Sequence, residues 1–263
     1  MTDKALEQLI DQYNQLVTQY PGLIYGIDKE LDCFYVAGVL HFSASFGKYS
    51  LQDSYLIRVD VPWNFDLFNV PAAYELSGRI PKAFHHHLNG NLCLGVYIAI
   101  YEKLKQDCTL LGYVNNLLVP YLFAYSCYVK YGEMPFGNAG HDKDAMLLYL
   151  QDHFPNVPIN RFLDFIIYMY MPQVYGSHRP CLCGSGRPLR DCHFTSIKAL
   201  ADIYPKVFMR YDMPEYMKQI NDKNVRCDSM ISLKNRKDFC RKIKHDLEAD
   251  RELLAQLNGK EIN

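Results

Sequence analysis

One cysteine in the first half of the chain follows three consecutive histidines. Cys93 lies between two leucines, six residues after His87 and eight after His85. A thiol with imidazoles a few residues upstream can act as a nucleophile whose neighbours take up its proton or stabilise an oxyanion. The same pattern also describes an inert cysteine in a buried strand, because cysteine is among the most buried residue types. Spacing alone leaves both interpretations open.

A second group of metal-binding residue types lies further along the chain. Three cysteines and one histidine are arranged as a C-x-C pair and a C-H pair: Cys181, Cys183, Cys192 and His193. Four such ligands complete a tetrahedral zinc site and leave no position for water, so we expect a structural rather than a catalytic Zn2+. Gly184 and Gly186 allow the backbone to curl around the metal.

Composition and charge limit the classes of protein to which this chain can belong. Nine cysteines and an N-terminus without an apolar leader indicate a cytoplasmic protein whose thiols serve metal binding and catalysis. The longest apolar stretch, residues 117–129, is shorter than the ~20 residues of a membrane span, so we expect no membrane partner. A net charge of −1 argues against a nucleic-acid coat.

Hydrophobic periodicity predicts the elements that precede Cys93. Apolar residues recur at helical spacing between Leu6 and Val17, and Pro21-Gly22 ends that helix. Four strand-like runs with turn-rich connections follow, at residues 23–27, 33–44, 54–61 and 72–80. A helix, an antiparallel four-stranded meander and later helices predict an α+β fold.

The chain after Cys93 is predicted to be mainly helical. Thr109 is a candidate cap for a helix that runs towards Tyr131, with a kink at Pro120. A Gly/Pro-rich loop follows at 131–141. Further helices are expected at 144–154, 161–171, 197–209, 214–220 and 239–257. We predict three parts: a domain at 1–172, a zinc motif at 173–195 and a helical tail at 196–263.

The tail carries a cluster of basic residues that acidic residues soon balance. We expect a solvated helix face there and no nucleic-acid partner. The cluster consists of Lys234, Arg236, Lys237, Arg241, Lys242 and Lys244.

The segment around Cys93 resembles the active-site segment of ubiquitin-conjugating enzymes, and of their bacterial branch in particular. Gly90 and the Leu-Cys-Leu of residues 92–94 match the family pattern. The resemblance implies the ubiquitin-conjugating fold. The family's His-Pro-Asn is missing, and His85 stands where its asparagine would be. Asn89 is a candidate replacement amide. The loop at 131–141 resembles a bacterial proline-glycine-histidine loop, which implies that His141 lies near Cys93.

The cysteine-rich segment resembles SEC-C, a short zinc-binding motif attached to many proteins. The resemblance covers residues 180–193 and includes all four expected ligands. It implies a docking module.

The resemblance to conjugating enzymes implies an acyl carrier. Cys93 would form a thioester with an activated protein C-terminus and pass it to an amine, assisted by one or more of His85, His86, His87 and His141. No adenylating glycine motif is present, so activation must come from elsewhere. Two acyl donors are implied: a cGAS-like nucleotidyltransferase of an antiphage CBASS system, and a ubiquitin-like protein.

Two other classes of function stay open. The missing His-Pro-Asn fits an inactive scaffold that binds a partner through its SEC-C motif. A nucleic-acid adaptor that uses the zinc motif and the tail would instead bind in a steeply salt-dependent way.

Overall fold

The computed structural model describes residues 3–67, 69–136, 149, 151–154, 157–158, 161–201, 229–242 and 245. The chain forms two compact units, Met1–Asp142 and Lys143–Asn263, which we describe separately. The helix expected at 161–171 therefore belongs to the same unit as the cysteine-rich segment, whereas the sequence analysis assigned it to the first domain. None of the described helices is long and apolar enough to cross a membrane.

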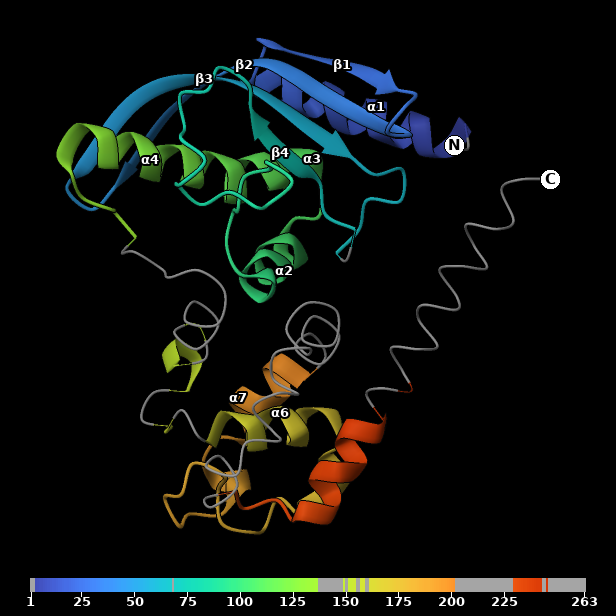
Figure 1. The fold of residues 1–263 in the computed structure, drawn as a ribbon, viewed down its shortest axis with the longest axis vertical. Helices are drawn as coiled ribbons and strands as arrows, with labels where there is room; N and C mark the ends of the chain where they lie inside the picture. Colours follow the sequence, from blue (N-terminus) through green and yellow to red (C-terminus); the bar gives the residue numbers. More distant parts are fainter. Residues whose placement is uncertain are drawn as a thin grey trace. The chain divides into compact units, whose positions relative to one another are not determined.

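The first unit is a four-stranded antiparallel sheet with helices packed on it (Figure 1). Helix α1 (Asp3–Gln19) precedes the strands, which follow one another across the sheet in chain order. They are β1 (Leu23–Asp28), β2 (Cys33–Phe46), β3 (Tyr49–Val61) and β4 (Ala72–Glu75). The expected helix and the four expected strands are all present, and the mixed architecture agrees with an α+β class.

Two strand boundaries differ from the prediction by about five residues, and the ends of β1 and β2 differ by one or two. Strand β3 begins at Tyr49 because the β2–β3 hairpin closes on a two-residue turn at Gly47, whose φ is 56°. The polar side chains of residues 49–53 had suggested a turn, but the backbone of these residues pairs with β2. Strand β4 ends at Glu75 because the Glu75 carboxylate accepts the N–H groups of Ser77 and Arg79, which bends the chain away from the sheet.

One face of the sheet forms the core of this unit. Alternate residues of β2 and β3 are buried and pair across the strands, as Phe34 does with Val61 and Leu40 with Tyr55. Helices α1 and α4 contribute buried side chains to the same cluster. Residues of the opposite phase, such as Val39, are exposed. The two-residue period of a strand thus separates a covered face from an open one.

A broken helical segment follows the cysteine loop. It comprises α2 (Tyr97–Gln106), α3 (Leu110–Tyr113), a π-helical turn (Val114–Leu118) and α4 (Val119–Tyr131). The predicted cap is confirmed, because the Thr109 hydroxyl accepts the Gly112 N–H at 3.0 Å. Pro120 lies in the first turn of α4, directly after the π-helical turn. The break expected at the proline therefore takes the form of a π-helical turn.

The second unit is built around α6 (Phe162–Tyr170), close to the range predicted for a helix at 161–171. Helix α7 (Phe194–Ala201) begins three residues before the helix expected at 197–209. Residues 233–242 are helical, whereas the prediction began at 239. The helix expected at 214–220 lies outside the described residues, as do most of the one at 144–154 and the ends of those at 197–209 and 239–257.

The basic cluster of the tail is only partly solvated. Lys234, Lys237 and Arg241 are exposed, but Arg236 is 8% exposed, so the expectation of a solvated face is wrong for this residue. The reason is helical phase, since Arg236 precedes the buried Phe239 by three residues and shares its face. Lys244 lies outside the described residues.

Candidate cysteine loop and metal centre

A short hairpin holds Cys93 between β4 and α2. His86 and Leu92 form an isolated antiparallel bridge. On one side of it the Cys93 N–H donates to the His85 carbonyl at 2.7 Å, and on the other the His87 N–H donates to the Asn91 carbonyl at 2.9 Å. His85 is therefore the cross-strand neighbour of Cys93. Of the predicted histidines, His85 lies opposite Cys93 and His87 lies opposite Asn91. His86 lies opposite Leu92.

The hairpin turn depends on a glycine. The Gly90 N–H donates to the His87 carbonyl at 2.9 Å, and Gly90 has a φ of 88°. Other residues seldom adopt this left-handed conformation. Asn89, the amide that the sequence analysis offered as a replacement, is exposed in the middle of this turn. The glycine that matched the family pattern thus sets the reversal that brings His85 opposite Cys93.

The hairpin is anchored on both sides. The Leu92 N–H donates to the Ala73 carbonyl of β4 at 2.8 Å, and the Leu92 side chain is 2% exposed. On the other side the Phe84 ring packs edge-on against Tyr121 and Tyr125 of α4, with centroids 5.8 and 4.8 Å apart. The backbone around Cys93 is therefore fixed by both the sheet and a helix.

His85 has an unusual backbone conformation. Its φ is 41°, a left-handed value that costs a non-glycine residue about 1–3 kcal/mol. The His85 carbonyl accepts the Cys93 N–H and also the Tyr121 hydroxyl at 3.2 Å. Such strain persists only where the surroundings impose it, and it is common at functional sites. The strained residue is the one across from the candidate nucleophile.

The environment of Cys93 differs from that of the buried cysteines of the same unit. Cys33 and Cys127 are buried, and burial raises the pKa of both thiols. Cys93 is half-buried. The pKa of Tyr121 is raised by burial and by the charge that Cys93 carries as a thiolate, which places the Tyr121 hydroxyl within electrostatic reach of the thiol. Cys93 is therefore less buried than Cys33 and Cys127, and its charge acts on the buried Tyr121 hydroxyl.

Two polar residues at this site, one in the loop and one in α4, could not be singled out from the sequence. Tyr121 belongs to an aromatic run of α4 and has no motif that would single it out. The side-chain oxygen of Asn91 is buried and has no hydrogen-bond partner in the part of the chain that the structure describes. Buried polar atoms of this kind are rare and call for an explanation. His141, predicted to lie near Cys93, falls outside the described residues.

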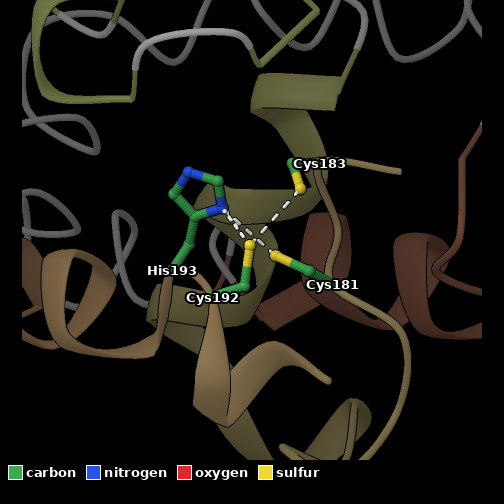
Figure 2. Close-up of side chains that lie close together, drawn as sticks. All are labelled: Cys181, Cys183, Cys192 and His193. Carbon is green, nitrogen blue, oxygen red and sulfur yellow. Dashed lines mark hydrogen bonds between the residues drawn. The ribbon is translucent and has the colours of Figure 1, made fainter. Parts of the chain in front are cut away.

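The four predicted metal ligands come together in the second unit (Figure 2). His193 Nδ1 lies 3.3 Å from the sulfurs of both Cys181 and Cys192, and the sulfurs of Cys183 and Cys192 are 3.8 Å apart. All four ligand atoms lie within 4.8 Å of one another. Tetrahedral zinc with Zn–S bonds of about 2.3 Å separates two sulfurs by about 3.8 Å, so the cluster has the size of a metal site.

Two tight turns and a helix start position these ligands. The Cys181 N–H donates to the Arg187 carbonyl at 2.6 Å, and the Gly184 N–H donates to the Cys181 carbonyl at 2.9 Å. Gly184 and Gly186 have φ values of 84° and 75°, as the sequence analysis required of them. Helix α7 starts directly after His193. Cys181 and Cys183 are thus held in a turn, and Cys192 and His193 are held at the start of a helix.

Two of the four ligands have pKa shifts that favour their metal-binding forms, and one has the opposite shift. Burial and the positive charge of Arg187 lower the pKa of His193, which favours the neutral imidazole that binds metals. Burial raises the pKa of Cys183, but hydrogen bonds from Ser185 and the neighbouring cysteines outweigh it, so this pKa is lowered overall. The pKa of Cys181, which is fully buried, is raised by that burial to about 12. A buried thiol of this kind is deprotonated when it binds a metal ion.

The molecule therefore has two candidate sites, one in each compact unit. The first is a half-buried thiol on a strained hairpin. The second is a closed set of four soft ligands that could hold a metal ion. Their functions have to be argued from these geometries, because no protein-family model, no curated protein and no solved structure matches the chain.

Proposed function

We propose that the protein is an acyltransferase of the ubiquitin-conjugating type with Cys93 as its acyl carrier. The observation that carries the proposal is the hairpin, in which the half-buried Cys93 is bonded through its N–H to the strained His85. The element order supports the proposal. In this chain a helix and a four-stranded antiparallel meander precede the cysteine loop, and the ubiquitin-conjugating fold that the sequence resembles has the same order.

The chemistry consists of two acyl transfers. The Cys93 thiolate attacks the activated carbonyl of a protein C-terminus, a thioester forms and the activating group leaves. An amine then attacks the thioester carbonyl, an amide bond forms and the Cys93 thiolate is released. The amine loses a proton in this step, and our candidates to accept it are His85, which lies opposite Cys93 in the hairpin register, and His87, which lies opposite Asn91.

The acyl donor is a second protein. We propose the C-terminus of a cGAS-like nucleotidyltransferase of a CBASS system, with a ubiquitin-like protein as the other donor of the same chemistry. The carboxylate must arrive already activated, because the chain has no adenylating glycine motif. A reducing cytoplasm is the compartment in which both the Cys93 thiol and the cysteine cluster keep their function.

We assign Zn2+ to the cysteine cluster, in a structural role. The donor set of three sulfurs and one nitrogen is the one that zinc prefers, and it leaves no ligand position open. Cys181, Cys183, Cys192 and His193 would hold the ion. Bound zinc would stabilise the local fold and thereby present the surrounding surface to a partner, as the resemblance to SEC-C implies.

The proposal is tested by intact-mass spectrometry under non-reducing conditions. The protein is purified after co-expression with its genomic neighbours, as wild type, Cys93→Ala and Cys108→Ala. We expect a covalently linked partner in the wild type and in Cys108→Ala, whose cysteine is also half-buried, but none in Cys93→Ala. Equal adducts in all three proteins would contradict the role of Cys93.

The second candidate function is that of an adaptor without catalysis. The missing His-Pro-Asn and the closed ligand set favour it, since neither requires chemistry at Cys93. It predicts that iodoacetamide modifies Cys93 no faster than Cys108. Faster modification of Cys93 favours the acyltransferase.

A further inference from the structure

One hydroxyl group of α4 contacts two successive carbonyls of the cysteine loop. The Tyr121 hydroxyl lies 3.1 Å from the Phe84 carbonyl oxygen and 3.2 Å from the His85 carbonyl oxygen, and it donates to them. The His85 carbonyl is also the acceptor for the Cys93 N–H at 2.7 Å. Tyr121 and Cys93 are therefore joined through a single shared acceptor.

The Tyr121 hydroxyl contacts the residue with the strained backbone, His85. His85 has a φ of 41°, and its left-handed backbone turns its carbonyl away from the direction that an extended strand would give it. Two donors, Tyr121 and Cys93, hold this carbonyl in place. Removing one of them lets His85 return towards an ordinary conformation, and the Cys93 amide would follow because it is bonded to the same oxygen.

The hydroxyl is suited to remain a donor. Tyr121 is 9% exposed, and its burial raises its pKa, so the phenol stays protonated at the pH at which a thiolate forms. The charge of Cys93 raises this pKa further, because a phenolate and a thiolate in proximity repel each other. A neutral donor is therefore present throughout the reaction that we propose for Cys93.

We propose that Tyr121 is a positioning residue for Cys93, whose hydroxyl holds the Phe84 and His85 carbonyls and thereby sets the place and reactivity of the thiol. The inference rests on the proposed role of Cys93. The two can be tested separately, because the positioning role predicts how fast the Cys93 thiol reacts when no acyl donor is present.

The experiment measures alkylation of Cys93 by iodoacetamide in the full-length protein as a function of pH. The tryptic peptide 83–103 contains Cys93 as its only cysteine, so mass spectrometry reports this thiol alone. We expect Tyr121→Phe to slow the reaction about tenfold at about pH 7, which corresponds to a shift of one unit in the thiol pKa. Cys33 and Cys127 serve as buried thiols within the same sample.

Tyr125→Phe is the matched control. Tyr125 lies one turn further along α4 and donates to the Arg79 carbonyl at 2.8 Å, outside the hairpin. In Tyr125→Phe the alkylation rate of Cys93 should stay within about twofold of the wild-type rate, which is the variation expected when a distant hydrogen bond is lost. An unchanged profile in Tyr121→Phe would overturn the inference, and so would an equal loss in both variants.

Two further outcomes are separated by the same design. If Tyr121→Phe fails to fold by circular dichroism, 4-fluorophenylalanine at position 121 fills the volume of the hydroxyl without donating a hydrogen bond, and the same loss of reactivity is expected. If wild-type Cys93 reacts no faster than Cys33 and Cys127, the proposed function fails. If wild-type Cys93 reacts faster than these two thiols and Cys93 of Tyr121→Phe reacts at the wild-type rate, only the positioning role fails.

Discussion

At the scale of single residues, an ion pair between a half-buried carboxylate and a more exposed arginine makes stability depend on pH. Burial raises the pKa of Asp53, but hydrogen bonds from Arg79 (2.8 and 2.6 Å) and Ser126 (2.7 Å) outweigh it and lower this pKa to about 2. Because the folded-state pKa lies below the unfolded value, the stabilisation is complete above pH ~4 and is lost as the pH falls towards 2. Because water around the exposed Arg79 screens the pair, this stabilisation amounts to at most about 2 kcal/mol.

We expect Asp53→Asn to lose that pH dependence. Urea unfolding of the wild type should weaken by up to about 2 kcal/mol between pH 4 and pH 2, and the variant should show a smaller change over the same range. Asp11→Asn, which alters an exposed carboxyl of α1, should keep the wild-type dependence. A wild-type slope in Asp53→Asn would show that the Arg79 pair has no effect on the folded state.

At the scale of elements, a close backbone approach joins β2 to the turn after α1. Gly38 has a φ of 141°, and a Cβ at this position would lie 2.2 Å from the carbonyl oxygen of Gly22. The obstacle is backbone, which has no rotamer by which to move away. Gly47 also has a positive φ, of 56°, but a Cβ there meets nothing within 4 Å.

The two glycines give a matched pair of substitutions. Gly47→Ala should cost roughly 1–2 kcal/mol of unfolding free energy, from its left-handed backbone alone. Gly38→Ala should cost more than about 4 kcal/mol, because strand β1 must also move, and such losses are exceptional for one residue. Urea unfolding followed by circular dichroism measures both, and equal costs would show that β1 and its turn can shift freely.

At the scale of the whole molecule, the two units should respond differently to metal removal. A structural zinc site contributes roughly 10–16 kcal/mol apparent in small zinc peptides, so chelation should unfold the region around the cluster. The sheet of the first unit contains none of the four ligands and should keep its stability. We expect a strong chelator to remove one of two calorimetric transitions.

Variants separate the ligands from other cysteines of the second unit. Cys181→Ala should abolish zinc binding and mimic the chelator, because its sulfur is a fully buried member of the set. Cys240→Ala changes a half-buried cysteine outside the cluster and should bind zinc as the wild type does. Elemental analysis of both proteins provides the measurement, and a full complement of zinc in Cys181→Ala would contradict the ligand assignment.

The sequence by itself determined the elements and the ligand set. Period-two alternation predicted the four strands, and periodic leucines predicted α1, because burial of one face dictates those patterns. The four candidate metal ligands were recognisable because ligand types at short spacing must be held by local turns. The family resemblance made Cys93 the candidate nucleophile, whereas its spacing alone favoured an inert buried cysteine.

Only the tertiary structure decided how the cysteine loop is held. The donation from Tyr121 to the His85 carbonyl, which Cys93 also uses, depends on α4 lying beside a hairpin about thirty residues away in sequence. Arg236 was misjudged for a related reason, because local charge suggested solvent, whereas helical phase places it on the face of the buried Phe239, whose ring packs against Tyr170 of α6. Patterns along the chain reveal periodic burial and local spacing. Contacts between distant segments follow from packing, which no single stretch encodes.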